Sequence, residues 1–427
     1  MRTMVLRGIA LAGAAALVLS ACSSGGDDEP SADASTAPCT ADGVLKIGNV
    51  LPQTGSLAFL GPPEFAGSQL AVDQINAAGG VLGEQVESFD GDSGDTSTNI
   101  AVTTTDEMLQ RGVDVIVGAA SSGVTKTIID KITSAGVLQI SPANTSTEFI
   151  DWPDEGLYFR TAPADQFQGA VLAEVATKDG VTKPVVLARQ DSYGESLAQT
   201  FSANFQSAGG PLAGESIIYD PDADTFETEV GAAKAAAPDG VVLIGFEESA
   251  KIVQEMIKQG IGPDQVKLFL VDGNLSNSLF KDLPAGIMNG TKGTLPGAQA
   301  ADAFREQLLQ VDPDLNDFSY AAESYDAVNL VALAAVAAGS DCGPDIAAQM
   351  QAVSSGGEPC TNFEECAKLL SEGKDIDYDG QSGPVEFADN GDPSKAVMGV
   401  YVFGADNQYG PSEFVGPAEV PALPQGQ

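Results

Sequence analysis

The sequence has no histidine and few cations. Its 427 residues include 20 Lys and Arg against 60 Asp and Glu, which gives a formal net charge of −40. Without histidine, a Ser-His-Asp triad, a Cys-His pair and a zinc site with an imidazole ligand are all excluded. A strongly acidic chain repels phosphates, so nucleic acid is excluded as a partner.

The sequence is also poor in long apolar runs. Hydrophobic residues make up 43% of the chain and charged residues 19%, which is typical of a globular protein with a large core. The length is enough for two or three domains.

The run Gly8 to Ala21, preceded by Arg2 and Arg7, is too short to span a bilayer and has the charge placement of a secretory signal.

The predicted signal ends in Leu19-Ser20-Ala21-Cys22, which resembles the lipobox of bacterial lipoproteins. The resemblance implies a signal peptide over 1–21 and a lipid on Cys22. Residues 22–43 are predicted to be a flexible acidic tether, because Ser23 to Pro38 contain no bulky apolar residue. The folded body is therefore expected outside the cytoplasm, anchored to the cell membrane but not embedded in it.

Four further cysteines are Cys39, Cys342, Cys360 and Cys366. An even number in an oxidising compartment predicts two disulfides. Spacing alone leaves three pairings open, and free buried cysteines are the alternative.

From Val44 onward, short β-branched runs alternate with stretches of helical pattern. Strands are predicted at Val44–Val50, Val86–Asp90, Val113–Val117, Val137–Ile140, Pro184–Ala188, Ser216–Tyr219, Gly240–Ile244, Val266–Val271, Val385–Ala388 and Val397–Phe403. Helices are predicted at Pro63–Ala77, Ser97–Gln110, Val124–Ser134, Glu195–Ser207, Thr225–Ala236, Glu248–Gln259, Asp302–Val311 and Tyr320–Ala338. This alternation predicts an α/β protein with two doubly wound parallel-sheet lobes and a ligand cleft at the carboxyl ends of the strands.

Motifs for catalysis or nucleotide binding are absent or incomplete. The sequence has no G-x-G-x-x-G or Walker motif, and no cofactor is expected. Ala119-Ala120-Ser121-Ser122-Gly123 lacks the first glycine of a nucleophile elbow. The strings Ser278–Lys281 and Ser371–Lys374 lack the companion motifs of serine acyl-transfer enzymes. We therefore do not expect an enzyme.

One acidic string fits a calcium loop. Residues 375–380 with Glu386 match D-x-D-x-D-G-x₅-E, the pattern of an EF-hand. Gly383 and Pro384 stand where that loop would enter a helix, which favours a plain acidic turn. No metal site is predicted, although calcium at Asp375–Glu386 remains an alternative.

Several stretches in order along the chain strongly resemble the leucine/isoleucine/valine-binding protein family, the substrate-binding subunits of branched-chain amino acid ABC importers. They include Leu51-Pro52-Gln53-Thr54-Gly55, Leu70 to Val81, Gly118 to Gly123, Ile140 to Thr145, Phe159-Arg160-Thr161, Ser192-Tyr193-Gly194, Pro238 to Leu243, Tyr325-Asp326-Ala327 and Asn390-Gly391-Asp392. The resemblance covers nearly all of 44–403.

This resemblance implies a type I periplasmic-binding fold with three crossovers between two lobes. The first lobe is expected over 44–160 and 296–387, and the second over 161–295 and 388–412. Residues 413–427 are expected to be a flexible tail. The implied partners are an amino acid, an ABC permease and its ATPase, and the protein is expected to be a monomer.

The family pattern also implies ligand-binding residues. In the first lobe they are Ala120, Ser121, Ser122, Ala143 and Thr145, which would hold the backbone groups of the amino acid. The start of the Val124–Ser134 helix suits a carboxylate, because unpaired N–H groups and a positive dipole lie there.

In the second lobe the pattern implies Tyr193, Phe246 and Asp272, and Leu60 and Tyr320 would line the side-chain pocket. Asp272 would neutralise the ammonium, although the family usually has the longer Glu there. Ordinary alternatives are that Ser122 only caps a helix, that Asp272 is a turn residue and that Phe246 is core.

The sequence therefore predicts a substrate-binding lipoprotein of an ABC importer that binds a branched-chain or other apolar amino acid. The alternative is a sensor of the same fold for amides, urea or another small carboxylate. Urea, short amides and aromatic acids also remain open as ligands, because pockets vary more than folds.

Overall fold

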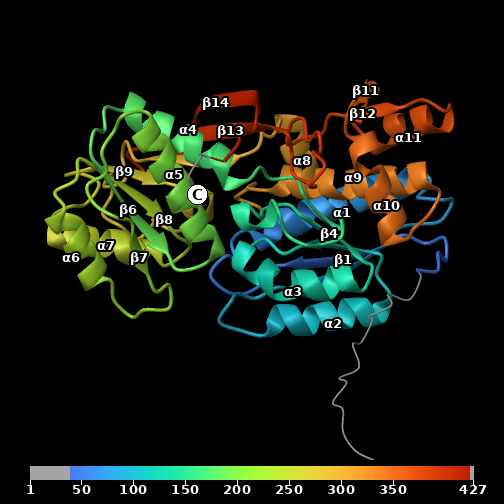
Figure 1. The fold of residues 1–427 in the computed structure, drawn as a ribbon, viewed down its shortest axis with the longest axis horizontal. Coiled ribbons are helices and arrows are strands. Elements are labelled where there is room, and N and C mark those ends of the chain that lie inside the picture. Colours follow the sequence, from blue (N-terminus) through green and yellow to red (C-terminus); the bar gives the residue numbers. More distant parts are fainter. Residues whose placement is uncertain (1–38, 424–427) are drawn as a thin grey trace, which may run out of the picture. The chain divides into compact units, whose positions relative to one another are not determined.

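The computed structural model describes residues 39–423 of the chain. Within them the chain forms two α/β lobes, each built on its own sheet (Figure 1). The predicted fold class is confirmed. Cys22 and the predicted signal peptide lie outside the described residues.

The first lobe contains a five-stranded sheet in which every pair of neighbouring strands is parallel. Its strand order is β2 (Glu87–Asp92), β1 (Lys46–Leu51), β3 (Val115–Gly118), β4 (Leu138–Ser141) and β5 (Tyr158–Arg160). The connecting helices are α1 (Gly61–Ala77), α2 (Ile100–Arg111) and α3 (Ser122–Ser134), and the short helix η1 (Thr147–Phe149) follows β4. The central strands β3 and β4 are fully buried, as expected of strands covered on both faces.

The second lobe contains a seven-stranded sheet. Its order is β14 (Tyr409–Glu419), β13 (Lys395–Phe403), β10 (Lys292–Pro296), β9 (Lys267–Leu270), β8 (Gly240–Ile244), β6 (Pro184–Arg189) and β7 (Ile217–Tyr219). Its helices are α4 (Asp165–Lys178), α5 (Ser192–Ser207), α6 (Glu227–Ala235) and α7 (Ser249–Gln259), and the short helix η2 (Asp272–Asn274) follows β9. The sheet is not wholly parallel, because β13 runs antiparallel to both β10 and β14.

The chain passes between the lobes three times: after β5, after β10 and before β13. After the second passage it returns to the first lobe and adds further helices and a two-stranded sheet. These are α8 (Asp302–Val311), α9 (Ala321–Ala338), α10 (Gly343–Val353), β11 (Glu358–Cys360), α11 (Phe363–Ser371) and β12 (Ile376–Tyr378).

Helix α9 lies beside α1 (Figure 1), although the two are far apart in the sequence. A Cβ added at Gly67 of α1 would come within 2.2 Å of the Ala321 carbonyl oxygen, so this close approach requires glycine. Among the described helices, α9 is long and apolar enough to cross a membrane, but 83% of it is buried in the protein. Helix α9 is therefore part of the core of the first lobe.

Most predicted strands and helices are confirmed to within a few residues, and the predicted bounds of β8 and α8 are those observed. The strand predicted at Val385–Ala388 is wrong, because that segment forms only an isolated bridge between Phe387 and Pro393. The flexible tail predicted from 413 is wrong as far as Glu419, because β14 pairs there with β13.

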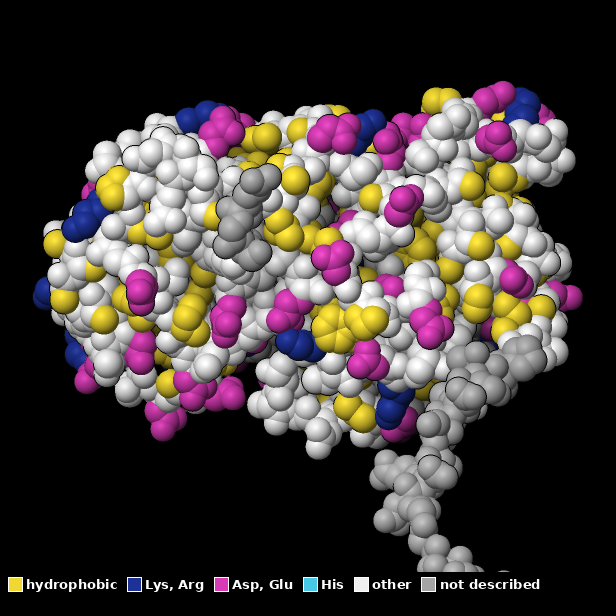
Figure 2. Space-filling model, in the orientation of Figure 1, with side chains coloured by type: hydrophobic (Ala, Val, Ile, Leu, Met, Phe, Trp, Pro, Cys, Tyr) yellow, Lys and Arg dark blue, Asp and Glu magenta, His cyan; other side chains and the backbone are white. Residues whose placement is uncertain are grey.

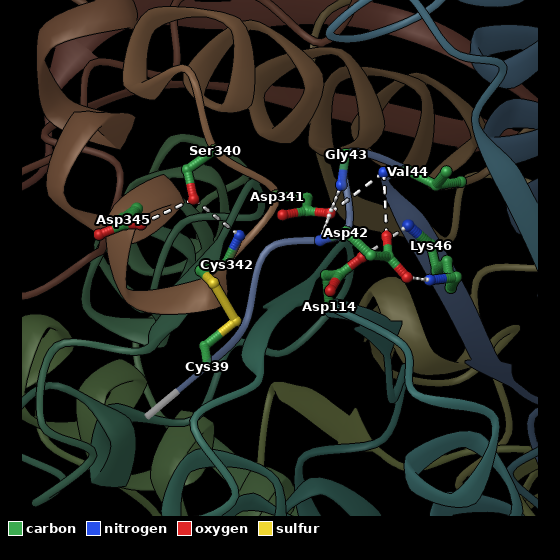
Figure 3. The surroundings of a disulfide bond; sticks show 10 residues. All are labelled: Cys39, Asp42, Gly43, Val44, Lys46, Asp114, Ser340, Asp341, Cys342 and Asp345. Carbon is green, nitrogen blue, oxygen red and sulfur yellow. Dashed lines mark hydrogen bonds and ion pairs between the residues drawn. A yellow bond between two sulfur atoms is a disulfide. The ribbon is translucent and has the colours of Figure 1, made fainter. Parts of the chain in front are cut away.

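The predicted tether ends sooner than expected. Cys39 forms a disulfide with Cys342, and the Asp341 Oδ2 atom accepts hydrogen bonds from the backbone N–H groups of Gly43 at 2.7 Å and Val44 at 3.1 Å (Figure 3). The second disulfide joins Cys360 and Cys366. Two disulfides are therefore confirmed, and residues 39–43 are fastened to the first lobe rather than flexible.

The calcium alternative is not supported. Ile376–Tyr378 form strand β12 instead of a loop, and the Glu386 Oε1 atom lies 2.7 Å from the Lys395 Nζ atom. Within residues 39–423 there is no group of three or more Cys, Asp or Glu side chains that could hold a metal ion.

On the visible face, acidic side chains are spread widely among few Lys and Arg (Figure 2).

Candidate functional site

A small cavity lies between the two lobes. It is lined by Leu57, Leu60, Ala120, Ser121, Ser122, Ala143, Tyr193, Phe246, Asp272, Gly273 and Tyr320. The centre of a water-sized sphere can move through only about 10 Å³ of it, which is room for about one water molecule. A larger ligand would need some of these side chains to move.

The side of the cavity that we call the first wall consists of Ala120, Ser121, Ser122 and Ala143. Ser121 has an extended backbone and precedes α3, whose first residue is Ser122. Ser121 and Ser122 line the cavity, so the helix start lies beside it, and the unpaired N–H groups of a helix start favour a negatively charged ligand group.

The first wall is held in place by hydrogen bonds from buried polar side chains behind it. The Asn144 Nδ2 atom donates to the Ala120 carbonyl oxygen at 2.8 Å. The Ser141 hydroxyl donates to the Ala119 carbonyl oxygen at 2.7 Å and accepts from the Ala143 N–H at 3.2 Å. The wall therefore presents backbone groups and small side chains in a fixed geometry.

The opposite side, which we call the second wall, consists of Tyr193, Phe246, Asp272 and Gly273. Tyr193 is on the first turn of α5, which begins after Asp191, whose carboxylate accepts a hydrogen bond from the Gly194 N–H at 2.8 Å. The Tyr193 and Phe246 rings are stacked with centroids 5.4 Å apart. This wall is apolar apart from hydroxyl and carboxylate groups.

Asp272 accepts hydrogen bonds from three neutral side chains. Its Oδ1 atom accepts from the Tyr193 hydroxyl at 2.6 Å and from the Gln168 Nε2 atom at 2.8 Å. Its Oδ2 atom accepts from the Tyr320 hydroxyl at 2.7 Å. A carboxylate oxygen has room for two donors, so Oδ2 can accept one more hydrogen bond, or a second if Tyr320 moves.

Burial raises the pKa of Asp272 above its ordinary value of 3.8, although the hydrogen bonds from Tyr193, Tyr320 and Gln168 act in the opposite direction. Burial and the neighbouring Asp272 charge also raise the pKa of the Tyr193 and Tyr320 hydroxyls, which therefore stay protonated donors. An ammonium ion placed here would supply the positive charge that this carboxylate lacks among its direct hydrogen-bond partners.

A buried ion network supports the second wall from behind. The Arg189 guanidinium carbon lies 3.6 Å from the centroid of the Phe246 ring. Its Nε atom is 2.6 Å from the Asp191 carboxylate, and its NH1 atom is 3.0 Å from Glu248. Glu248 Oε1 also accepts hydrogen bonds from the Phe246 N–H at 3.0 Å and the Tyr219 hydroxyl at 2.9 Å. Arg189 thus links the segments that carry Tyr193 and Phe246.

The two lobes also touch beside the cavity. The Ser192 hydroxyl of α5 donates to the Glu148 carboxylate of the first lobe at 2.6 Å. The Thr147 N–H of the first lobe donates to the Ser196 hydroxyl of α5 at 3.0 Å. These contacts bring the two walls together.

The structure brings together all the ligand residues predicted from the sequence except Thr145. Thr145 is fully buried, and its carbonyl oxygen accepts from the Asp165 N–H at 2.6 Å. The sequence prediction missed Leu57 and Gly273, which lie near or beside the predicted Leu60 and Asp272. It also missed Arg189, for which no sequence motif gave a signal.

Sequence comparisons with known proteins identify a family that this chain matches. A sequence model of the family described as periplasmic binding protein matches residues 44–364. The chain is 29% identical over 326 residues to Leu/Ile/Val-binding protein homolog 1 of Brucella abortus (strain 2308), with 73% of this chain and 82% of that protein covered. It is 30% identical over 268 residues to the leucine-, isoleucine-, valine-, threonine- and alanine-binding protein of Pseudomonas aeruginosa, with 62% and 70% covered.

Solved structures show the same fold. The leucine binding protein LivK of Thermotoga maritima has a TM-score of 0.72 and 20% identity, with 87% of this chain and 99% of that chain covered. The branched-chain amino acid transporter substrate binding protein LivJ of Streptococcus pneumoniae, in complex with isoleucine, has a TM-score of 0.70 and 24% identity, with 86% and 100% covered. A solute binding protein of R. palustris, in complex with 4-hydroxybenzoate, has a TM-score of 0.70 and 16% identity, with 90% and 99% covered.

Proposed function

Because this chain belongs to the periplasmic binding protein family, we propose that it binds an α-amino acid with an apolar side chain in the cavity between its lobes. Family membership implies a solute-binding protein that works outside the cytoplasm. An α-amino acid as the ligand goes beyond what family membership implies. The observation that carries it is the pair of unlike walls, a helix start facing a buried carboxylate.

The two walls suit the two charges of a zwitterion. The carboxylate of the amino acid would accept hydrogen bonds from the N–H groups at the start of α3, beside Ser121 and Ser122. The ammonium would donate to Asp272 Oδ2, which holds a single hydrogen bond from protein side chains. Charge-assisted hydrogen bonds of both kinds are strong where water is excluded.

The apolar part of the ligand would lie against Leu57, Leu60 and the stacked rings of Tyr193 and Phe246. Burial of a branched aliphatic side chain there would contribute about 1.5–3 kcal/mol to binding. The sequences named Leu/Ile/Val-binding proteins among the relatives support this choice of side chain.

The protein would also deliver the bound amino acid to a transporter in the cell membrane. Lipidation at Cys22 would hold the protein at the outer face of the cell membrane, and closure of the lobes on the ligand would present the loaded form to an ABC permease and its ATPase. The lipobox sequence Leu19-Ser20-Ala21-Cys22 supports the anchor. Mass spectrometry of the membrane-bound protein would detect the lipid on Cys22, and a Cys22→Ala variant should be released from the membrane.

An aromatic carboxylate is a second candidate ligand. The Tyr193 and Phe246 stack could hold a benzoate ring, and the R. palustris structure named above contains 4-hydroxybenzoate. Such a ligand has no ammonium, so it would leave Asp272 without a cationic partner. This is why we favour the amino acid.

Calorimetric titration of the purified protein with the standard amino acids, urea, acetamide and benzoate tests the proposal. We expect micromolar or tighter binding of leucine, isoleucine or valine. Binding of benzoate or an amide, with no heat from any α-amino acid, would contradict the proposed ligand while leaving the family assignment intact.

A further inference from the structure

A second cavity lies directly behind one residue of the ligand site. We call it the hinge cavity. It has about 240 Å³ of room for the centre of a water-sized sphere. Its lining is mixed, with Ala298, Phe318, Tyr320, Tyr401 and Tyr409 beside the charged side chains of Arg305, Asp317 and Glu323. These residues come from both lobes and from the passage between β10 and α8. Tyr320 also lines the small cavity between the two walls, which we call the ligand cavity.

The two cavities are very unequal. The ligand cavity offers about 10 Å³ by the same measure, so the side chains around it leave no room for an amino acid. The adjacent hinge cavity is large enough to take up a side chain. The residue between them, Tyr320, is fully buried and stands at the start of α9.

Tyr320 also occupies one of the two acceptor positions on the Asp272 oxygen that the ligand would use. Its hydroxyl donates to Asp272 Oδ2 at 2.7 Å, whereas the other two side-chain donors, Tyr193 and Gln168, bind Oδ1. Oδ2 has a second acceptor position, but an ammonium that reaches it would need space that the Tyr320 side chain now fills. Displacement of Tyr320 would therefore free a hydrogen-bonding position and enlarge the ligand cavity in a single movement.

We propose that Tyr320 is a gate that determines ligand specificity: the ligand's ammonium replaces its hydroxyl on Asp272, and its ring moves into the hinge cavity. The room in the hinge cavity then limits how far the ring can move and how large an amino acid side chain the site accepts. This inference rests on the proposed function, because it requires an amino acid in the ligand cavity.

The first test removes the hydroxyl alone. In Tyr320→Phe, Asp272 keeps its bonds from Tyr193 and Gln168, but an incoming ammonium has no hydrogen bond to displace. We expect the best-bound amino acid to bind about tenfold more tightly by calorimetry, the change expected from removing one such competing hydrogen bond. Weaker binding would mean that the hydroxyl contacts the ligand directly, and would overturn the gate.

The second test fills the hinge cavity. Ala298→Leu places a larger side chain in the hinge cavity without touching the ligand cavity. We expect it to weaken binding of leucine by about tenfold. Ala301→Leu is the matched control, because Ala301 is exposed and lines neither cavity. It should leave affinity unchanged.

A double-mutant cycle separates a gate from general damage to the hinge. In a Tyr320→Ala background there is no ring to accommodate, so Ala298→Leu should change leucine affinity by less than about twofold. An equal loss in both backgrounds would overturn the gate. If Ala298→Leu fails to fold, as judged by thermal unfolding, Ala298→Val serves in the same cycle.

The outcomes for the wild-type protein distinguish the two proposals. If it binds no α-amino acid, the proposed function fails and the gate fails with it. If it binds one and the cycle shows no coupling between Tyr320 and Ala298, the gate alone is wrong.

Discussion

The two walls of the ligand cavity are built in different ways. The first wall presents backbone groups and small side chains, fixed by neutral hydrogen bonds from Ser141 and Asn144. The second wall presents aromatic rings and a carboxylate, supported by the buried charges of Arg189 and its partners. The first wall should therefore tolerate side-chain substitution and changes of pH, whereas the second should tolerate neither.

The largest effect is expected from removing the cation behind the second wall. Arg189→Met leaves the carboxylates of Asp191 and Glu248 buried without their partner. We expect a loss of about 3–5 kcal/mol in the free energy of unfolding, measured by urea denaturation. Lys258→Met is the control, because its ion pair with Glu227 is 63% exposed on both side chains, and it should cost about 0–1 kcal/mol. Equal losses in the two variants would contradict the role of the network.

The next effect is on affinity. Asp272→Ala removes the only carboxylate that lines the cavity among the described residues. We expect amino acid binding to weaken by about 2–5 kcal/mol in calorimetric titrations, because the ammonium would be buried without a counter-charge. Near-normal affinity would refute the assignment of Asp272 to the ammonium. Asp264→Ala, at an exposed position away from the cavity, should bind normally.

A third effect concerns pH. Burial raises the pKa of Asp272 above 3.8, so amino acid affinity should begin to fall at a higher pH than an ordinary aspartate would require, and by about tenfold per unit below the pKa. The same pKa shift has the opposite effect on the stability of the fold. The folded protein holds this proton more tightly than the unfolded chain does, so the contribution of Asp272 is greatest below pH 3.8 and is lost as pH rises through its folded pKa.

The pH dependence can be measured by titration of the same amino acid at several pH values. Asp272→Asn should remove this part of the dependence. A wild-type affinity that is constant down to the pH at which the protein unfolds would contradict an ionised Asp272 in the complex.

The smallest effect is expected at the first wall. Ser122→Ala removes the hydroxyl that accepts a 3.3 Å hydrogen bond from the Ser146 N–H, but leaves the backbone N–H groups at the start of α3 in place. We expect affinity to change by about 0.5–1.5 kcal/mol, the ordinary value of one hydrogen bond. A loss as large as that of Asp272→Ala would mean that the hydroxyl, rather than the backbone, binds the carboxylate.

The fold was predictable where local pattern and burial agree. The β-branched run Gly240–Ile244 predicts a buried central strand, and β8 occupies these residues. Strand β14 was missed because Gly410, Pro411, Gly416 and Pro417 weaken any local strand signal, and its pairing with β13 depends on tertiary structure. The four residues Val385–Ala388 look locally like a strand but lie between Pro384 and Pro393 and find no ladder partner.

The residues that line the cavity between the walls were predictable only through the family resemblance, which places Ser122, Tyr193 and Asp272 at the ends of strands. The interactions that define the site were not. Gln168 and Tyr320 are 104 and 48 residues from Asp272, and Glu248 is 59 residues from Arg189. Such contacts depend on how the lobes fold and meet, which no local pattern records.

The most direct test of the two-wall account is a crystal structure of the protein with the amino acid that binds best in calorimetry. We expect the ligand carboxylate at the N–H groups of the start of α3 and the ammonium within hydrogen-bonding distance of Asp272 Oδ2. A ligand bound in the opposite orientation, or outside the cavity between the walls, would contradict the account.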